Sequence, residues 1–260
     1  MKIYQPAGRA REYSPLALNY FKGCTHNCKY CYVPSMLSRF NSSYDHKNVL
    51  SPSEKGFKEL ELSAKKMQGC EQILLSFTGD PYCGVNPEVT TRVLEILNKY
   101  KHKVAILTKG GERALNDLEL IKSFGNRIKI GATLTFDNVK DSKEWESGAA
   151  FPSERLNTLE TFANNGIKTW ASFEPVIIPG QSLNLLSQVA PFIDHVKIGK
   201  INNYKGIDKT IDWAKFIFES VRILRESKMN DRFYIKKDLL SHNVGVYLSG
   251  NETNEDWLNL

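Results

Sequence analysis

A chain of 260 residues is long enough for one large domain, and α/β barrels commonly reach this length. Hydrophobic residues make up 41% of the chain, which is enough for a sizeable core, and charged residues make up an ordinary 25%. No apolar run reaches the length of a membrane span, so an integral membrane protein of the helical class is excluded.

The charge balance and the cysteine content bear on the partners and the cellular compartment of the protein. Lys and Arg number 35 against 29 Asp and Glu, a surplus of 6. That surplus suits a polyanionic partner such as nucleic acid, and it equally serves solubility. The chain has five cysteines, three of them clustered, a pattern that does not indicate a disulfide framework. The first residues lack the apolar segment of a signal peptide. We therefore expect a cytoplasmic protein.

Short apolar runs alternate with longer amphipathic segments along the chain. Strands are expected at residues 16–21, 73–77, 104–108, 128–135, 169–173 and 195–198. Helices are expected at residues 51–67, 86–100, 112–123, 153–165, 183–193 and 208–228. Ser51 is the expected cap of the first helix, and Asn86-Pro87 opens the second. A long surface loop is expected at residues 138–151, and short extra strands are expected at 233–236 and 244–248.

This alternation predicts an α/β fold with a parallel sheet and helices on its outside. The pattern contains six units of strand and helix, each thirty to forty residues long. No linker, repeat or second domain is visible, so residues 1–260 are expected to form a single domain.

Residues 23–34, GCTHNCKYCYVP, hold Cys24, Cys28 and Cys31 in the spacing C-x3-C-x2-C. Soft thiolates select iron–sulfur clusters, zinc or copper(I) over hard cations. Three thiolates can hold three irons of a cubane cluster and leave the fourth iron open to a substrate or cofactor. A closed zinc site needs a fourth ligand, and His26 is poorly placed because it lies between two cysteines. A zinc loop or unrelated thiols remain the alternatives.

Chemistry in barrels of parallel strands sits at the carboxyl ends of the strands. The first expected strand ends in the cysteine loop, and polar residues follow each later strand. These residues are Ser76, Thr78, Gly79 and Asp80; Thr108 and Lys109; Thr133 and Thr135; Ser172 and Glu174; Lys197 and Lys200. We expect them to converge on one cavity.

The stretch CTHNCKYC, with Tyr30 as its aromatic residue, resembles the signature of radical S-adenosylmethionine (SAM) enzymes. The longer stretch AREYSPLALNYFKGCTHNCKYCYVPSML resembles a subgroup related to spore photoproduct lyase and often labelled "DNA repair photolyase". The resemblance implies a partial (β/α)6 TIM-like barrel, here with a core at about residues 14–230 and a carboxyl-terminal extension at 231–260. It also implies a 4Fe–4S cluster whose open iron chelates SAM, and whose electron cleaves SAM to give a 5′-deoxyadenosyl radical.

The resemblance and the positions of polar residues at the strand ends together suggest roles for the site residues. Cys24, Cys28 and Cys31 are the implied cluster ligands, and Tyr30 is implied to pack near the adenine. The other cofactor-binding candidates are Ser76, Thr78 and Gly79 for the SAM amino group, Lys109 for its carboxylate, Thr133 for ribose or carboxylate, and Glu174 for ribose or substrate. Glu174 is otherwise a structural acid before Pro175. Tyr32 is a candidate for radical relay or for simple packing, and Lys236-Lys237 places an ammonium over the cavity or forms a solvated strand end.

One departure from the lyases concerns the hydrogen-atom donor. Spore photoproduct lyase uses a cysteine on its second barrel strand, where this chain has Leu74. Cys83 is the nearby candidate for a replacement donor, with an incidental loop cysteine as the alternative, and Cys70 is expected to be structural. Direct reversal of a thymine dimer is therefore disfavoured.

Two classes of function follow from the sequence. The first is a radical SAM enzyme that acts on an unidentified substrate, with nucleic acid ahead of a peptide or small molecule. Such an enzyme needs a reductant such as flavodoxin or ferredoxin. The second is a non-catalytic iron–sulfur or zinc protein that retains the loop, although such a protein does not need polar residues at every strand end.

Overall fold

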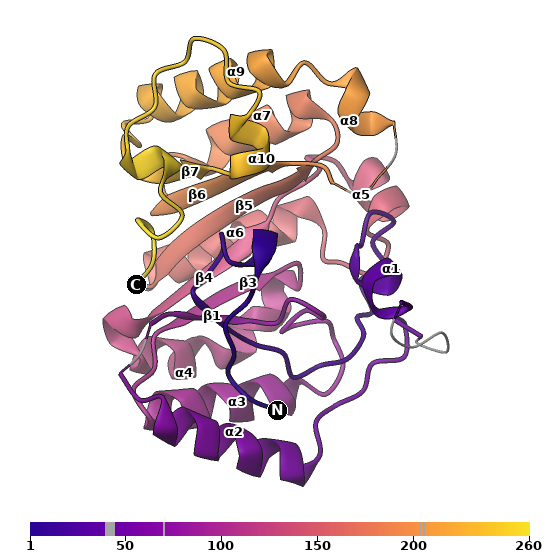
Figure 1. Cartoon of the computed structure of the whole chain (residues 1–260), viewed down its shortest axis with the longest axis vertical. Coiled ribbons are helices and arrows are strands. Elements are labelled where there is room, and N and C mark those ends of the chain that lie inside the picture. The colour runs from indigo at the N-terminus through magenta and orange to yellow at the C-terminus, as the bar shows by residue number, and fades with distance from the viewer. Residues whose placement is uncertain (40–44, 70, 203, 205) are drawn as a thin grey trace.

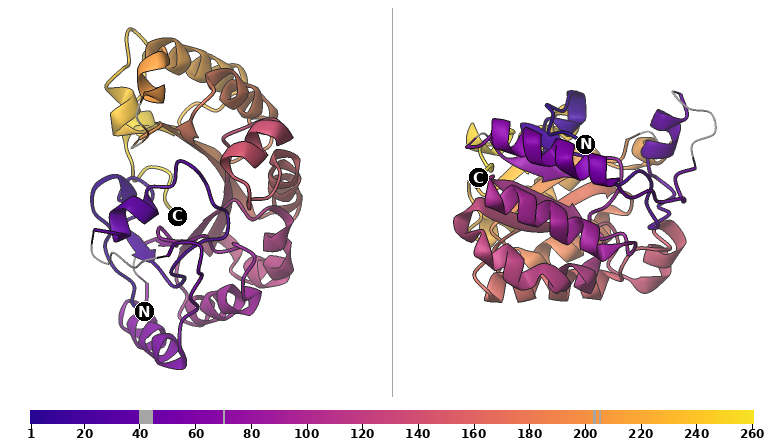
Figure 2. Two further views of the ribbon diagram at one scale, coloured as in Figure 1. Left: turned by 90° about the vertical axis from the view of Figure 1, so that its right-hand side faces the viewer. Right: turned by 90° about the horizontal axis from the view of Figure 1, so that it is seen from below.

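The computed structural model describes residues 1–39, 45–69, 71–202, 204 and 206–260. Its centre is a parallel sheet whose strands follow one another in chain order. The strands are β1 (Leu16–Leu18), β2 (Ile73–Leu75), β3 (Val104–Thr108), β4 (Ile128–Thr133), β5 (Lys168–Val176), β6 (His195–Lys200) and β7 (Phe233–Ile235). The sheet curls into an open half-barrel, and the helices cover its convex side (Figures 1 and 2). The predicted partial barrel is confirmed.

Helices connect successive strands on the outside of the sheet (Figure 1). The α-helices are α1 (Val33–Leu37), α2 (Glu54–Lys66), α3 (Pro87–Lys99), α4 (Leu118–Ser123), α5 (Val139–Trp145), α6 (Pro152–Asn164), α7 (Pro179–Val189), α8 (Ile207–Thr210), α9 (Trp213–Glu226) and α10 (Lys237–Leu240). Short 3-10 helices occur at Gly8–Ala10, Gly111–Asp117, Gly125–Arg127 and Asn251–Thr253. No helix in the described ranges has both the length and the apolar character needed to cross a bilayer.

Burial of the strands on both faces explains their apolar sequences. All residues of β1, β2, β4 and β7 are buried, as expected for parallel strands covered by helices on one side. On the inner side, Leu74, Ala105 and Trp170 pack against one another. Gly131 in β4 leaves room for the indole, because a Cβ there would lie only 2.5 Å from Trp170 Nε1.

Several sequence predictions differ from the structure at element ends. The residues expected to extend the sheet at 233–236 form β7, which pairs in parallel with β6. Residues 244–248 form no strand, because the Asn243 side chain bonds the backbone of Val246 in a local turn. Helix α2 begins at Glu54 because Ser53, not Ser51, caps it through a bond from Gly56 N.

Three longer segments also differ in part from the sequence prediction. The expected surface loop at 138–151 contains helix α5, which Asn138 caps by accepting a hydrogen bond from Asp141 N. The single helix expected at 208–228 is divided into α8 and α9, because Asp212 caps α9 through Lys215 N. The helix expected at 112–123 begins as a 3-10 helix before it becomes α4.

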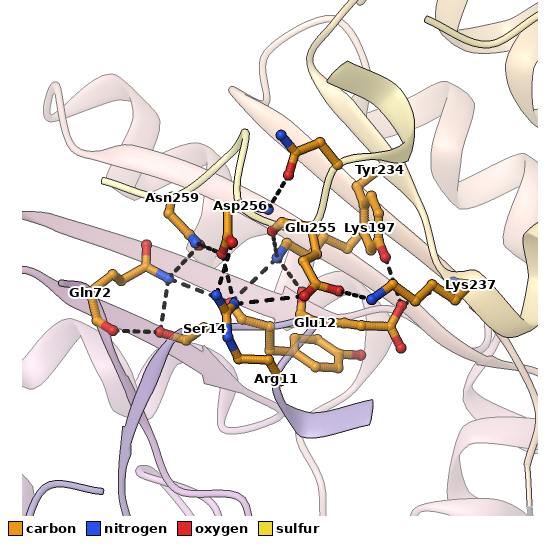
Figure 3. Close-up of polar contacts among 12 residues, drawn as sticks. Arg11, Glu12, Ser14, Gln72, Lys197, Tyr234, Lys237, Glu255, Asp256 and Asn259 are labelled. Carbon is orange, nitrogen blue, oxygen red and sulfur yellow. Dashed lines mark hydrogen bonds and ion pairs between the residues drawn. The ribbon is translucent and has the colours of Figure 1, made fainter. Parts of the chain in front are cut away.

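The last residues of the chain cover the amino ends of the strands together with residues 11–14 (Figure 3). Lys197 in β6 donates from Nζ to the carbonyl oxygen of Glu12 at 2.6 Å and to that of Glu255 at 3.5 Å. Arg11 pairs with Asp256 at 2.7 Å, and Lys129 in β4 donates to the carbonyl of Leu258 at 2.7 Å. Burial, together with the charge of neighbouring Lys236, lowers the pKa of Lys197 to about 7. These contacts fix the segment that carries Tyr13 into the inside of the half-barrel.

Candidate functional site

A cavity of about 780 Å³ lies at the carboxyl ends of the strands. Cys24, Cys28 and Cys31 line it. So do the other predicted cofactor-binding residues, which come from the cysteine loop and the ends of β2, β3, β4 and β5: Tyr30, Ser76, Thr78, Gly79, Lys109, Thr133 and Glu174. The fold therefore brings together residues that are up to 150 positions apart in the chain (Glu174 and Cys24).

The cysteine loop is held in place by backbone contacts. Cys24 N donates to the carbonyl of His46 at 2.8 Å, Cys31 N donates to that of Cys28 at 3.1 Å, and Cys28 forms an antiparallel bridge with Glu146. Burial raises the pKa of all three thiols, that of Cys28 to about 12. A bound metal has to offset this cost, because the thiolate is the form that binds metal.

The donor set consists of three soft thiolates on one loop, the ligand type that binds iron–sulfur clusters. Among the described residues, no group of three or more His, Cys, Asp or Glu side chains is arranged to hold a metal ion.

The end of β2 supplies an unsatisfied polar group beside the cavity. Ser76 has a positive φ of 60°, and its buried hydroxyl oxygen has no hydrogen-bond partner in the described part of the chain. Leaving such a group unpaired costs about 1–3 kcal/mol, so the site fits a ligand that brings a donor or acceptor. Gly79 lets this strand end approach the cysteine loop, because a Cβ would lie 2.9 Å from the carbonyl oxygen of Gly23.

Lys109 follows β3 and supplies a positive charge to the cavity. Its ammonium lies 5.5 Å from the ring centroid of Tyr30, a distance at which a cation is attracted to the ring. In the part of the chain that the structure describes, no carboxylate pairs with Lys109. The residue therefore fits the role of partner for a ligand carboxylate.

Asp80, one of the polar residues that follow β2, connects three parts of the site. Its carboxylate accepts hydrogen bonds from Tyr82 N at 2.8 Å, Thr108 Oγ1 at 2.6 Å and Lys109 N at 2.8 Å. It also lies 3.5 Å from Nδ1 of His26 in the cysteine loop. Burial lowers the pKa of His26 to about 4, with a contribution from Lys109 and against the opposing effect of Asp80. Asp80 thus fixes Lys109 relative to the cysteines.

Glu174 belongs to a polar cluster on the cavity wall. It accepts hydrogen bonds from the Tyr13 hydroxyl and from Lys236 Nζ, the latter at 2.5 Å. Lys236 also lies 4.4 Å from the ring centroid of Tyr13, whose hydroxyl is 3.1 Å from Ser172 Oγ. The interpretation of Lys236-Lys237 as a solvated strand end is wrong for Lys236, because pairing with Glu174 allows that ammonium to be buried.

Among the remaining candidates that the structure describes, Tyr32 lines the cavity, whereas Thr135 and Cys83 do not. Tyr32 lines the cavity, and its hydroxyl donates to the carbonyl of Phe77 at 2.8 Å. The Thr135 hydroxyl donates a hydrogen bond to Glu146 Oε1 at 3.2 Å, and Thr135 is not among the residues that line the cavity. Cys83 is buried in the core and also does not line the cavity. Cys70 lies outside the described residues.

Three residues of the site were not singled out from the sequence: Tyr13, Glu146 and Arg155. Glu146 falls in a segment expected to be a loop. Their partners come from distant parts of the chain, such as Tyr30, which is 116 positions from Glu146. Only the folded topology brings these residues together.

The family model for the radical SAM superfamily matches residues 18–192. This chain belongs to the radical SAM superfamily. The match begins at the last residue of β1 and covers the cysteine loop and the strands from β2 to β5, whose ends form most of the cavity wall. Membership implies SAM and a 4Fe–4S cluster as cofactors.

Relatives and solved structures agree with this assignment. An uncharacterised protein of Methanocaldococcus jannaschii is 28% identical over 162 residues, which cover 62% of this chain and 60% of that protein. An uncharacterised protein of Acidianus two-tailed virus is 24% identical over 64% of this chain and 57% of its own length. The match thus spans about three fifths of each relative.

Two groups of solved structures share the fold. Streptococcus suis SuiB bound to S-adenosylmethionine superposes with a TM-score of 0.64 at 16% identity, covering 90% of this chain and 53% of SuiB. A spore photoproduct lyase variant superposes with a TM-score of 0.65 at 12% identity, covering 89% of this chain and 79% of the lyase. At these identities the similarity establishes the fold alone.

Proposed function

We propose that this protein is a radical SAM enzyme that reductively cleaves SAM for hydrogen abstraction from a substrate. The observation that carries the proposal is the shared cavity of the three cysteines and the polar strand ends, with Ser76, Lys109 and Thr133 on its wall. A protein that only stores a cluster does not need a cavity of about 780 Å³ lined in this way.

In this proposal each residue binds, orients or shields the cofactors. Cys24, Cys28 and Cys31 hold three irons of a 4Fe–4S cluster. When bound, the reduced cluster supplies the electron that cleaves SAM to methionine and a 5′-deoxyadenosyl radical. Ser76, with Thr78 and Gly79, takes the amino group of SAM, while Lys109 pairs with its carboxylate.

The aromatic and polar walls take the rest of the cofactor and the substrate. Tyr30 packs near the adenine, and Thr133 bonds the ribose or carboxylate. Glu174 has one oxygen, Oε2, committed to Tyr13 and Lys236. Its other oxygen, Oε1, has a 3.5 Å contact to Asn202 and no closer hydrogen bond among the described residues, and it is available to hydroxyl groups of the ribose or substrate. Tyr32 and the other aromatic residues exclude water, which the radical chemistry requires.

The substrate is the open part of the proposal. Leu74 lines the cavity where the lyases carry their donor cysteine, which argues against dimer reversal. The surplus of 6 positive charges favours nucleic acid, while a peptide is the alternative because SuiB has been solved with its precursor peptide SuiA. The proposed reductant is a flavodoxin or ferredoxin, and the proposed compartment is the reducing cytoplasm.

Replacing Lys109 with alanine tests the cofactor pocket. We expect SAM affinity to fall by about 1.5–3 kcal/mol, the usual contribution of a hydrogen bond to a charged group. The cluster remains, because Lys109 is not a ligand. The measurement is an anaerobic titration with SAM, followed by the electron paramagnetic resonance (EPR) spectrum of the reduced cluster.

Lys103→Ala is the matched control for this substitution. Lys103 directly precedes β3 and is exposed at its amino end, whereas Lys109 follows β3 at its carboxyl end. The control is expected to bind SAM as tightly as the wild type. Equal SAM affinities for the two variants would remove Lys109 from the site, and a wild-type cluster that does not respond to SAM would contradict the proposed function.

A further inference from the structure

Residues 145–150, which run from the last residue of α5 toward the start of α6, lie against the cysteine loop. Their backbone meets that loop at three places: the bridge from Glu146 to Cys28, a bond from Lys29 N to the carbonyl of Trp145 at 2.8 Å, and a bond from Gly148 N to the carbonyl of His26 at 3.0 Å. One end of the segment also reaches β3, because Ala150 N donates to the carbonyl of Lys109 at 2.9 Å. The segment therefore contacts both the cluster ligands and a proposed SAM-binding residue.

The buried ion pair between Glu146 and Arg155 lies at the centre of these contacts. Glu146 and Arg155 are each 1% exposed, and Arg155 Nη2 lies 2.5 Å from Glu146 Oε2. The guanidinium also donates to the carbonyl of Thr133 at 2.9 Å and to that of Ala150 at 2.9 Å. Arg155 thus connects the end of β4 to residues 145–150.

The second oxygen of Glu146 extends the network to the cysteine motif itself. Oε1 accepts a hydrogen bond from the hydroxyl of Tyr30, which lies between Cys28 and Cys31 in the sequence. It also accepts one from Thr135 Oγ1 at 3.2 Å. One buried carboxylate therefore joins the second half of the cysteine loop to the strand ends.

Stability alone does not account for such a pair. Well-packed apolar side chains of similar volume are often as stabilising as a buried ion pair, or more so. What apolar residues cannot supply is directional bonding to Tyr30, Thr133 and Thr135 at once. Buried groups that orient metal ligands through hydrogen bonds commonly govern how firmly the metal is held.

We propose that the Glu146–Arg155 pair positions Cys28 and Cys31 for cluster binding and aligns them with the strand ends that take SAM. This inference rests on the proposed function, because it requires that the cysteines hold a cluster. Glu146 and Arg155 are positioning residues that act through Tyr30, the Cys28 backbone and Thr133. Without the pair, the loop keeps its cysteines but loses the contacts that hold them at a fixed separation.

The test compares iron retention between variants of the anaerobically reconstituted protein. The main variant combines Glu146→Leu with Arg155→Met, which removes both charges and avoids leaving one of them buried and unpaired. Tyr30→Phe is the second variant, because it deletes only the oxygen that reaches Glu146. The matched control combines Glu252→Leu with Arg225→Met. In this ion pair Arg225 lies on α9, and the fully buried carboxylate of Glu252 lies in the 3-10 helix Asn251–Thr253.

The expected result is release of iron to a chelator about 10–100-fold faster in the Glu146→Leu, Arg155→Met variant, which takes the usual 10–100-fold loss of metal affinity on removing groups that orient metal ligands as a change in the release rate. Tyr30→Phe is expected to release iron about tenfold faster, and the control at the wild-type rate even if its unfolding temperature falls. The EPR signal of the reduced cluster should also change in the first two variants only.

Four outcomes bear on the inference. Wild-type release rates in the folded main variant and in Tyr30→Phe would overturn the inference, as would equal acceleration in the control. If the main variant does not fold, the rate of Tyr30→Phe decides. A wild-type protein that takes up no iron would refute the proposed function itself, and the inference with it.

Discussion

Alanine at Cys28 abolishes the cluster. The expected result is loss of the visible absorbance and of stoichiometric iron from anaerobically reconstituted protein, because two thiolates leave half of a four-iron cluster without protein ligands. The same result is expected for Cys24→Ala and Cys31→Ala. Iron analysis and the absorbance spectrum measure it directly.

Cys83→Ala is the matched control, because this thiol is buried in the core and does not line the cavity. It is expected to keep its iron. If Cys28→Ala retains the wild-type iron content, the cysteines do not hold the cluster. Zinc in place of iron after anaerobic reconstitution would instead support a structural metal loop.

Gly148→Ala is expected to separate the cysteine loop from residues 145–150. A Cβ at this position would overlap the carbonyl oxygen of Thr25 and lie 3.0 Å from its carbonyl carbon. Both partners are backbone atoms, so no side-chain rotation relieves the overlap. We expect a loss of about 1–3 kcal/mol of unfolding free energy, as for other overpacked sites, together with a lower iron content.

Gly180→Ala provides the comparison for this substitution. A Cβ at Gly180 meets nothing within 4 Å, and alanine favours the helix α7 in which it lies. Chemical denaturation of the metal-free proteins measures the stability, and iron analysis after reconstitution measures the cluster. A Gly148→Ala protein as stable and as rich in iron as Gly180→Ala would show that the close approach of the two segments is unimportant.

The parts of this fold that are visible in the sequence are those determined by neighbouring residues. Apolar runs such as 104–108 became buried strands because parallel strands are covered on both faces. The cysteine motif is equally local, since its three ligands fall within eight positions. Polar residues at strand ends could be assigned to one cavity because parallel strands all end on the same side of the sheet.

The parts that the sequence did not reveal depend on long-range pairing. Glu146 looks like one more charge in a polar loop until the fold places it against Arg155 and Tyr30. Lys236 looks like a solvated strand end until Glu174 pairs with it over the intervening strand β6. In each case burial of the charge is possible only with its partner present, and no spacing rule links the two positions.

The central claim is tested most directly by the fate of SAM. Anaerobically reconstituted protein, incubated with dithionite and SAM, is predicted to release 5′-deoxyadenosine and methionine, and the Cys28→Ala variant is predicted to release neither above background. With a substrate deuterated at its reacting carbon, the label should appear in the 5′-deoxyadenosine. A protein that holds its cluster and binds SAM, yet forms no 5′-deoxyadenosine with any reductant, would contradict the account and would be a cofactor-binding protein without radical activity.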